Sequence, residues 1–368
     1  MAGDELKHPQ KLPSSTHEVI VLLDGINFIL DNVDTAPQSH ELISYHYMVQ
    51  THEIRERVQQ ASIVIATQAP INGESLGEAP YLKFVIVPSV GTNHIDLEEC
   101  RRRGIRVANS PGSTSLAVAE HCLSMYFAAR RGTVTMHNVL RDVDENGKNI
   151  WKREGNASHK MKMANGNPPV ALCQEVVGIF GYGFIGKRLA TLCEALGMKV
   201  LISGRKTKPG GATTNTPAQN GNESTSSNGN SSVTRTPFDE VIRSATVLFI
   251  TCPLTPETAN MLDGPEFAAM RPEAVVINAG RGGVVNNVVL VQALRENRIS
   301  GAAVDVYDRE PASSVEDSVL LAEDARDLNL TLSPHVGYFS GQTVLMMDKM
   351  TRAHLKNYAT GEEGHYVV

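Results

Sequence analysis

The sequence predicts an α/β protein built from two doubly wound parallel-sheet domains, and three observations support this. Short runs rich in β-branched residues alternate with helical patterns along most of the chain, which is typical of parallel strands joined by crossover helices. Glycine is frequent, at 30 of 368 residues, while aromatic residues make up only 5%, a composition that favours close backbone approach. At roughly 150 residues per domain, the length allows two or three domains.

The first third of the chain holds one series of elements. We expect strands at 18–23, 62–67, 82–87 and 105–110, with helices at 51–60 and 97–103. A longer helix is expected from Ala117 to Arg131. Its apolar residues recur at helical spacing, which gives the helix one apolar face: Val118, Cys122, Met125 and Ala129.

A second series follows a polar stretch, 141–169, in which we expect a loop around Trp151. The expected strands lie at 175–181, 199–203, 247–252, 274–279, 301–307 and 328–333. The expected helices lie at 184–196, 286–298 and 340–360. Such strict alternation predicts a second parallel sheet.

Residues 209–235 stand apart from both series. They contain one branched aliphatic residue, Val233, and almost no charge, so they cannot bury enough apolar area to offset the entropy of ordering. We expect a disordered surface insertion. Its many Ser and Thr residues leave a phosphorylated or partner-binding segment open as an alternative.

Composition excludes several classes of function. Lys and Arg number 34 against 40 Asp and Glu, a net charge of −6, so no broad basic surface for nucleic acid is expected. No 18 apolar residues run together and no apolar leader opens the chain, so we expect no membrane span and a cytoplasmic protein. The five cysteines show no C-x-x-C spacing, which favours reduced thiols and no metal site.

A glycine pattern marks a dinucleotide site. Gly181, Gly183 and Gly186 form G-x-G-x-x-G between an expected strand and an expected helix, the context that makes this pattern informative. Gly181 permits a tight turn, Gly183 lets a pyrophosphate approach the backbone, and Gly186 lets helix and strand pack closely. A Walker loop is excluded because Arg188 stands where Ser or Thr must hold Mg²⁺. The alternative is a glycine-rich turn that binds nothing.

The next strand end predicts which cofactor binds. A carboxylate there would bond the ribose of NAD, but the sequence reads Ser203, Gly204, Arg205 and Lys206. Arg can grip a 2′-phosphate through charge-assisted bonds, so we expect NADP(H) to be preferred through Arg205, Ser203 and Lys206, with NAD(H) possible. The alternative is that these cations are solvated residues that lead into the insertion.

Three further motifs follow the glycine loop in order. NAGRGG places Arg281 beyond one strand, AAVDVYDREP places Asp305 and Glu310 at and beyond the next, and SPHVG places His335 beyond the last. All lie at expected carboxyl ends of parallel strands, where open α/β sheets bind ligands.

With these motifs the sequence resembles the D-isomer-specific 2-hydroxyacid dehydrogenases, most closely the glyoxylate/hydroxypyruvate reductase branch. Matching stretches include SVGTNHIDL, RGIRVANSPG, AVAEH, VVGIFGYGFIG, CPLTPET and INAGRGGVVN, and the resemblance runs from about residue 61 to 361. It implies that Arg281 binds substrate, His335 is the acid/base and Glu310 orients the His. The resemblance also implies that backbone N–H groups of Val90 and Gly91 hold the substrate carboxylate.

The resemblance further places Asp305 and residues 251–253 beside the nicotinamide. Together with the glycine loop and the second strand end, the expected cofactor contacts are Gly181, Gly183, Phe184, Ile185, Gly186, Ser203, Arg205, Lys206, Cys252, Pro253, Ala279, Gly280, Asp305 and Gly337.

The chemistry of 2-oxo acid reduction requires the same three side chains. Arg281 can hold the substrate carboxylate and polarise the carbonyl. The carbonyl oxygen needs a proton from a donor that titrates near neutral pH, the natural role of His335. Glu310 accepting from the other ring nitrogen would favour the imidazolium form.

These observations combine into one expected architecture. A flavodoxin-like substrate domain, 1–112 completed by 337–368, and a Rossmann cofactor domain, 113–336, would enclose an interdomain cleft. The expected activity is reduction of a small 2-oxo acid to a D-2-hydroxy acid. The alternative is a nucleotide-sensing, corepressor-like binding module with little turnover. The resemblance suggests a homodimer in which the helix 117–131 takes part.

Overall fold

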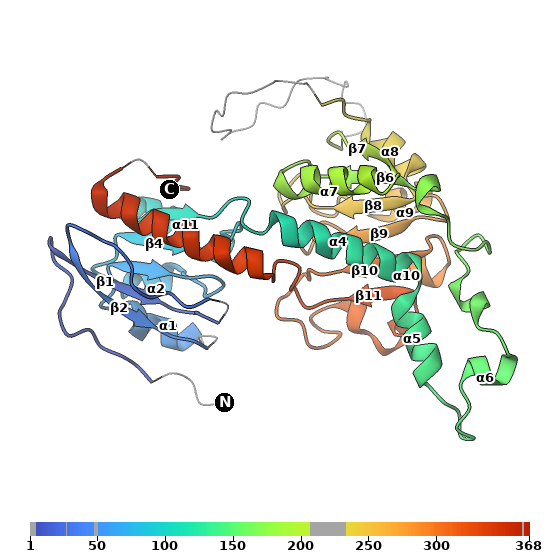
Figure 1. Cartoon of the computed structure of the whole chain (residues 1–368), viewed down its shortest axis with the longest axis horizontal. Coiled ribbons are helices and arrows are strands. Elements are labelled where there is room, and N and C mark those ends of the chain that lie inside the picture. Colours follow the sequence, from blue (N-terminus) through green and yellow to red (C-terminus); the bar gives the residue numbers. More distant parts are fainter. Residues whose placement is uncertain (1–4, 27, 48–50, 207–232, 363) are drawn as a thin grey trace. The chain divides into compact units, whose positions relative to one another are not determined.

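The computed structural model describes residues 5–26, 28–47, 51–206, 233–362 and 364–368 (Figure 1). The chain folds into two compact units, one of residues 1–117 and 339–368 and the other of residues 118–338. Each unit is built on one parallel sheet flanked by helices, so the predicted fold class is confirmed. This division lies after residues 117 and 338, whereas the boundaries expected from the sequence are 112 and 336.

The first unit contains a five-stranded parallel sheet in the order β2-β1-β3-β4-β5. Its strands are β1 (His17–Leu22), β2 (Ser39–Ser44), β3 (Ile63–Ile65), β4 (Phe84–Val87) and β5 (Arg106–Asn109). This strand order, 2-1-3-4-5, is that of the flavodoxin-like doubly wound fold. β2 was not predicted, because among its six residues only Ile43 is buried and the apolar pattern of a strand is missing.

Helices cover both faces of this sheet. Side chains of α1 (Thr51–Val58), α2 (Gly73–Gly77) and α3 (Leu97–Arg103) pack on one face, and those of α11 (Gly341–Thr360) pack on the other. α3 begins after Asp96, whose side chain accepts from the amide of Glu99, and ends at Gly104, whose φ of +68° suits glycine.

The second unit contains a six-stranded parallel sheet in the order β11-β10-β9-β8-β6-β7. Its strands are β6 (Val176–Phe180), β7 (Lys199–Ile202), β8 (Val247–Ile250), β9 (Val275–Asn278), β10 (Gly301–Val304) and β11 (Leu330–Leu332). The strand order reverses between β6 and β8. Ligands of open α/β sheets bind beyond the carboxyl ends of the strands at such a reversal.

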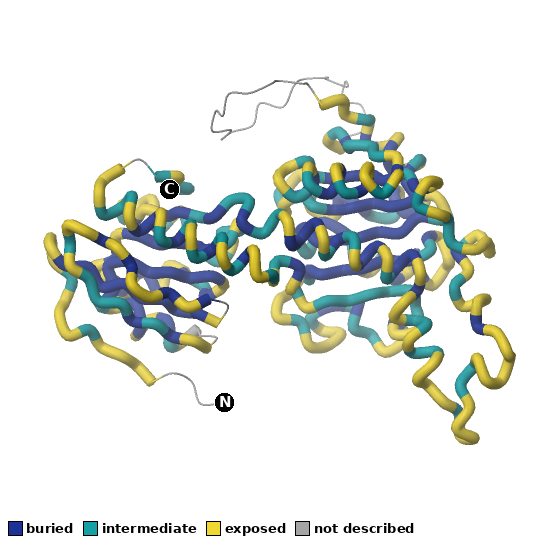
Figure 2. The backbone as a smooth tube through the Cα atoms, viewed as in Figure 1, coloured by how far each residue is buried: buried dark blue, intermediate teal, exposed yellow. Residues whose placement is uncertain are grey.

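Two layers of helices bury this sheet. α4 (Ser115–Arg130) and α7 (Phe184–Ala195) supply side chains to the core of one face. α8 (Phe238–Ser244), α9 (Gly264–Ala269) and α10 (Asn287–Arg295) supply those of the other. Strands buried on both faces read as continuous apolar runs, which explains why the sequence located them well. Figure 2 shows the central strands of the unit as buried along their lengths.

α5 (Thr133–Arg141) and α6 (Ile150–Glu154) extend away from the sheet of the second unit (Figure 1). The loop expected around Trp151 is instead α6, a short helix. Asn149 caps its start by accepting from the amide of Lys152, and Gly155 ends it with a φ of +73°. Within the described ranges there are also four short 3₁₀ segments, at Ser158–Met161, Leu172–Gln174, Val319–Leu321 and Glu323–Ala325.

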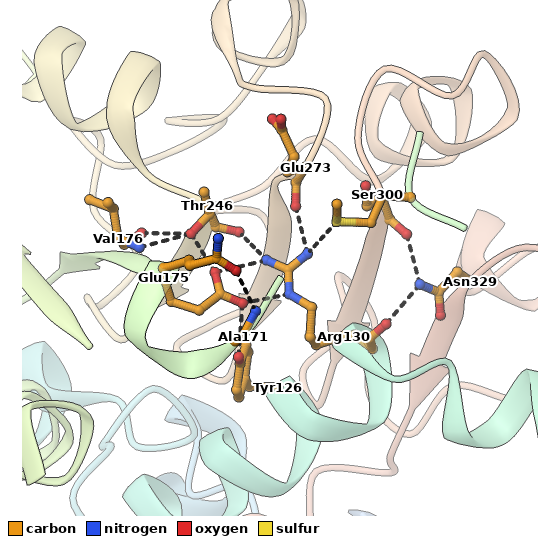
Figure 3. Close-up of polar contacts among 12 residues, drawn as sticks. Tyr126, Arg130, Ala171, Glu175, Val176, Thr246, Glu273, Ser300 and Asn329 are labelled. Carbon is orange, nitrogen blue, oxygen red and sulfur yellow. Dashed lines mark hydrogen bonds and ion pairs between the residues drawn. The ribbon is translucent and has the colours of Figure 1, made fainter. Parts of the chain in front are cut away.

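A buried ion pair fastens the amino ends of the strands in the second unit (Figure 3). Arg130, at the end of α4, meets Glu175 through two contacts, of 2.6 and 3.0 Å. The same guanidinium donates to the carbonyls of Thr246 and Glu273, which precede β8 and β9. Tyr126 and the hydroxyl of Thr246 donate to the Glu175 carboxylate. This Arg130–Glu175 cluster therefore joins α4 to the starts of three strands.

The insertion expected at 209–235 lies outside the described residues except for its last three positions. Of these, Arg235 donates to the carbonyl of Ser203 at 3.1 Å. Among the residues that the structure describes, no helix combines the length and apolar character that a bilayer crossing requires.

Candidate active site

The glycine loop lies between β6 and α7, at the strand reversal of the second unit. Gly183 is the N-cap residue of α7 and supplies no side-chain cap, so the first amides of the helix are left for another acceptor. A Cβ added at Gly183 would meet no atom within 4 Å. Packing within the protein therefore does not require glycine at this position, whereas a ligand that approaches the backbone closely would.

The other two glycines are required by the fold itself. Gly181 has a φ of +100°, and a Cβ there would lie 2.6 Å from the amide nitrogen of Cys252, which follows β8. A Cβ at Gly186 would collide with the carbonyl oxygen of Gly181. The loop and the first turn of the helix are thus held against the end of the neighbouring strand. This cradle fits a dinucleotide pyrophosphate at the helix N-terminus.

The residues after β7 differ in their exposure and in the groups to which their side chains bond. Arg205 is exposed, and no described residue bonds to its side chain. Ser203 is buried, and its hydroxyl donates to the carbonyl of Gly204. Lys206 points elsewhere, because its ammonium pairs with Glu266 at 2.8 Å and donates to the carbonyl of Met261. Of the expected 2′-phosphate contacts, the structure leaves Arg205 the most available.

Arg235 adds a second guanidinium that sequence reasoning missed. Thr236 forms a parallel bridge with Ser203, and its carbonyl accepts from the amide of Gly204 at 2.8 Å. This pairing brings Arg235 beside Ser203, two positions before Arg205. The only signal in the sequence is a cation at the far end of the insertion, and nothing in its spacing indicates that the two segments meet.

The three expected catalytic side chains follow three adjacent strands, with Arg281 after β9, Glu310 after β10 and His335 after β11. Nδ1 of His335 lies 2.6 Å from Oε2 of Glu310. The other carboxylate oxygen accepts from the amide of Tyr307 at 2.8 Å. Arg281 donates to the carbonyl of Gly280 at 2.8 Å and is close enough to act on the charge of Glu310. The structure therefore brings this set together.

Electrostatics keep the Glu310 carboxylate charged. Burial alone would raise its pKa, but the hydrogen bonds to His335 and Tyr307 and the charges of His335 and Arg281 outweigh burial and lower the pKa below its usual value. The paired side chains of His335 and Glu310 remain 36% and 34% exposed. Nε2 of His335 has no hydrogen-bond partner among the described residues, so it is free to exchange a proton with a ligand.

Backbone geometry also singles out His335. Its φ of +50° lies in the left-handed region that residues other than glycine rarely adopt. Such conformations cost about 1–3 kcal/mol and gather at functional sites, where the surroundings enforce them. The ring of Tyr338, three residues later, lies edge-on to the imidazole, with 6.4 Å between the two ring centroids.

The remaining expected cofactor residues differ in their burial and contacts. Cys252 and Ala279 are buried, and a Cβ at Gly280 would meet the carbonyl oxygen of Cys252 at 2.7 Å. Asp305 is only 3% exposed, and its carboxylate accepts from the amides of Val336 and Gly337. Pro253 and Phe184 are exposed. The assignment of these residues to a cofactor stays a prediction.

The expected carboxylate-binding amides belong to the first unit, in the loop after β4. The carbonyl of Val90 accepts from the side chain of Asn109 at 2.7 Å, and that of Gly91 accepts from the hydroxyl of Ser89 at 3.3 Å. In the described part of the chain, neither Val90 nor Gly91 donates its amide to a protein acceptor. The loop is thus shaped by its carbonyls and leaves two donors available.

His121 is a further residue that the sequence did not single out for function. It lies on α4, with Nε2 at 3.0 Å from the hydroxyl of Ser333 and 3.4 Å from the Asp305 carboxylate. Its only sequence signal is its place in AVAEH, far from the motifs at the strand ends. No group of three or more His, Cys, Asp or Glu side chains within the described ranges is arranged to hold a metal ion.

Comparison with known proteins identifies relatives of this chain. Residues 133–337, more than half of the chain, match the family model "D-isomer specific 2-hydroxyacid dehydrogenase, NAD binding domain". The chain is 29% identical to glycerate dehydrogenase of Methylorubrum extorquens over 89% of this chain and 92% of that protein. It is 28% identical to glyoxylate reductase of Pyrococcus furiosus over 92% and 90%.

A solved structure shares the fold. NADPH-dependent glyoxylate/hydroxypyruvate reductase of Sinorhizobium meliloti, with NADP and malonate, matches 95% of this chain and 97% of that chain with a TM-score of 0.68 and 23% identity. With the glycine cradle and the strand-end side chains in the expected order, the family match confirms the resemblance read from the sequence: the chain belongs to the D-isomer specific 2-hydroxyacid dehydrogenase family.

Proposed function

We propose that this nicotinamide-dependent enzyme reduces a small 2-oxo acid to the D-2-hydroxy acid, with NADPH as the preferred cofactor. The observation that carries the proposal is the 2.6 Å contact between Glu310 and His335, which follow β10 and β11, the next two strands of the sheet after β9, the strand that leads to Arg281. Relatives named glycerate dehydrogenase and glyoxylate reductase make glyoxylate and hydroxypyruvate the first substrates to test.

Each side chain has a distinct role in this reaction. Arg281 holds the substrate carboxylate and polarises the carbonyl. A bound nicotinamide cofactor supplies the hydride. Nε2 of His335 gives its proton to the carbonyl oxygen as negative charge develops there. Glu310 accepts from Nδ1, which fixes the ring orientation and stabilises the positive charge that the ring carries before the transfer.

The cofactor cradle supports NADPH over NADH. The amides at the start of α7 face the pyrophosphate position, with no capping side chain to compete. Arg205 follows β7, and Arg235 donates to the carbonyl of Ser203 just after the same strand. Guanidinium groups bind phosphate through paired, charge-assisted bonds. The carboxylate of Glu266 is paired with Lys206 at 2.8 Å.

The paired Glu310 and His335 favour turnover over the nucleotide-sensing alternative, because a sensor needs the cofactor cradle but no acid–base pair. The test is a panel of 2-oxo acids with NADPH or NADH, in which absorbance at the nicotinamide band is followed. We expect glyoxylate or hydroxypyruvate to be reduced with a higher kcat/KM for NADPH. Tight NADPH binding without consumption by any 2-oxo acid would contradict the enzyme assignment, and faster use of NADH would contradict the cofactor preference alone.

A homodimer and a cytoplasmic location belong to the same proposal. α5 buries none of its residues, and large apolar side chains of the α5–α6 segment are exposed: Val134, Leu140, Val143 and Trp151. An apolar surface of this kind is typical of a protein interface. Light scattering should give twice the chain mass, and a monomer would contradict the dimer. All five cysteines are free thiols, which suits a reducing compartment.

A further inference from the structure

The turn that carries His335 must be held in place by its surroundings. The φ of +50° at His335 is unfavourable for a side chain that bears a Cβ, so the conformation persists only where neighbouring contacts enforce it. Glu310 contacts the ring and not the backbone of this turn. The contacts that fix the backbone must therefore come from other residues.

One carboxylate grips the turn on both sides of His335. Oδ1 of Asp305 accepts from the amide of Val336 at 3.1 Å, and Oδ2 accepts from the amide of Gly337 at 3.0 Å. Oδ1 also receives the hydroxyl of Ser333, two residues before His335, at 2.6 Å. A Cβ at Gly337 would lie 2.7 Å from Oδ2, so the close approach requires glycine at that position.

Tyr307 adds a further contact to the same turn. Its hydroxyl donates to the carbonyl of Ser333 at 3.0 Å, so the hydroxyl and the carbonyl of Ser333 are both engaged. Asp305 and Tyr307 both follow β10, next to the strand that leads into the turn. The end of β10 thus provides a rigid support for the residue that follows β11.

His121 closes this network from α4, and its proton can be placed. An ionised carboxylate only accepts, so the 2.6 Å contact between Ser333 and Asp305 uses the single proton of the hydroxyl. Ser333 can then only accept from His121, whose Nε2 lies 3.0 Å away. Nε2 therefore carries a hydrogen, which it donates to Ser333 and shares with the Asp305 carboxylate, 3.4 Å from the same nitrogen.

The charge of Asp305 depends on these donors. Burial would raise the pKa of this carboxyl group, but the hydrogen bonds from His121, Ser333 and Gly337 outweigh burial and lower it. A buried carboxylate that loses a donor adjusts its remaining contacts. Here the remaining contacts are the backbone amides that follow His335.

We infer that His121 is a positioning residue for the acid–base step, acting through Ser333 and Asp305 to hold the backbone on both sides of His335. The inference rests on the proposed function, in which His335 transfers the proton. His121 does not touch the reacting atoms in this scheme. It sets the direction in which Nε2 of His335 points, and a displacement of about 1 Å at a reacting group can cost about 100-fold in rate.

The test compares His121→Leu, which removes the N–H donor, with His121→Gln, which retains one at similar reach. In His121→Leu we expect kcat to fall ten- to a hundredfold, with the NADPH dissociation constant from fluorescence and the melting temperature close to wild type. His121→Gln should recover most of kcat. Glu120→Gln, an exposed position on the same helix, serves as the matched control and should behave as wild type.

A double-mutant cycle separates positioning from packing. Ser333→Ala should lower kcat to a similar degree, and His121→Leu combined with Ser333→Ala should be no slower than Ser333→Ala alone. Additive losses, or a kcat in His121→Leu equal to wild type, would overturn the inference. So would an equal loss in His121→Gln and His121→Leu. If wild-type protein reduces no 2-oxo acid, the proposed function fails instead, which keeps the two failures distinct.

Discussion

Two acid–base clusters lie at opposite edges of the same six-stranded sheet. At the amino edge, Arg130 and Glu175 are 2% and 0% exposed in their side chains, and five further groups bond to the pair. At the carboxyl edge, His335 and Glu310 are about one-third exposed, and Nε2 of the imidazole has no partner in the described chain. The two pairs have the same N···O distance of 2.6 Å.

The difference shows how to separate a structural ion pair from a reactive one. Distance does not distinguish them, but unfilled hydrogen-bonding capacity does. Every donor of the Arg130 guanidinium is directed at a protein acceptor, so the pair can only hold the strands together. His335 has one ring nitrogen without a partner among the described residues, as the proton transfer proposed for it requires, and its backbone lies in the left-handed region.

The largest expected effect comes from removing the reactive group. His335→Asn eliminates the proposed proton donor while retaining a residue that tolerates positive φ. We expect kcat to fall by about 10²- to 10⁴-fold, the usual contribution of a general acid. Steady-state assays measure this loss, and an unchanged melting temperature serves as the control. A kcat within threefold of wild type would remove His335 from the mechanism.

Substitution in the buried Arg130–Glu175 pair should lower stability and leave kcat unchanged. Arg130→Met leaves the Glu175 carboxylate buried and uncompensated, so we expect the free energy of unfolding to fall by about 3–5 kcal/mol. Denaturant titration measures the loss. The kcat of the folded fraction should stay near wild type, and Arg130→Met with Glu175→Gln should be more stable than Arg130→Met alone. Normal stability with reduced kcat would mean that the amino edge also serves catalysis.

Substitutions at the proposed 2′-phosphate site should have a smaller effect, on the KM for NADPH. Each guanidinium bond to a phosphate contributes about 1.5–3 kcal/mol, so Arg205→Ala or Arg235→Ala should raise the KM for NADPH about 10- to 150-fold. The KM for NADH should hardly change. Lys206→Ala is the matched control, since this ammonium already pairs with Glu266, and it should leave the ratio of the two cofactors as it was. Equal losses with both cofactors would contradict recognition of the 2′-phosphate.

The smallest effect concerns pH. The lowered pKa of Glu310 keeps its carboxylate charged throughout the neutral range. In wild type, the rate should fall as the pH drops through the lowered pKa of Glu310, because the carboxylate that orients His335 then loses its charge. Glu310→Gln has no carboxylate to titrate, so this acid limb of the pH–rate profile should be missing from the variant. An acid limb that persists in Glu310→Gln would contradict the role of Glu310.

Some of this architecture was predictable, and the reason is local. Buried parallel strands are continuous apolar runs, so β8 and β9 were found within a few residues, and the caps at Asp96 and Gly104 mark the bounds of α3. β2 escaped because an edge strand buries little. α6 escaped because a five-residue helix held by its cap and a terminal glycine has no apolar periodicity.

Some residues of the candidate site were also predictable from the sequence, and others were not. Arg281, Glu310 and His335 each follow a recognisable strand, and parallel strands bring their carboxyl ends to one edge. Arg235 and His121 depend on tertiary meetings that no spacing encodes, one between segments on either side of the insertion and one between α4 and the turn after β11. Lys206 followed the expected pattern in sequence, but its long side chain bonds to Glu266.

The helix α4 links the two edges of the sheet, because it carries both Arg130 of the amino-edge cluster and His121 of the network around His335. Arg130 anchors its last turn at the amino edge of the sheet, while His121 reaches the turn of His335 at the carboxyl edge. Nine residues of helix span about 14 Å and are stiff along the axis. A shift or rotation of this helix about Arg130 therefore moves His121, and with it the contacts that hold the turn of His335.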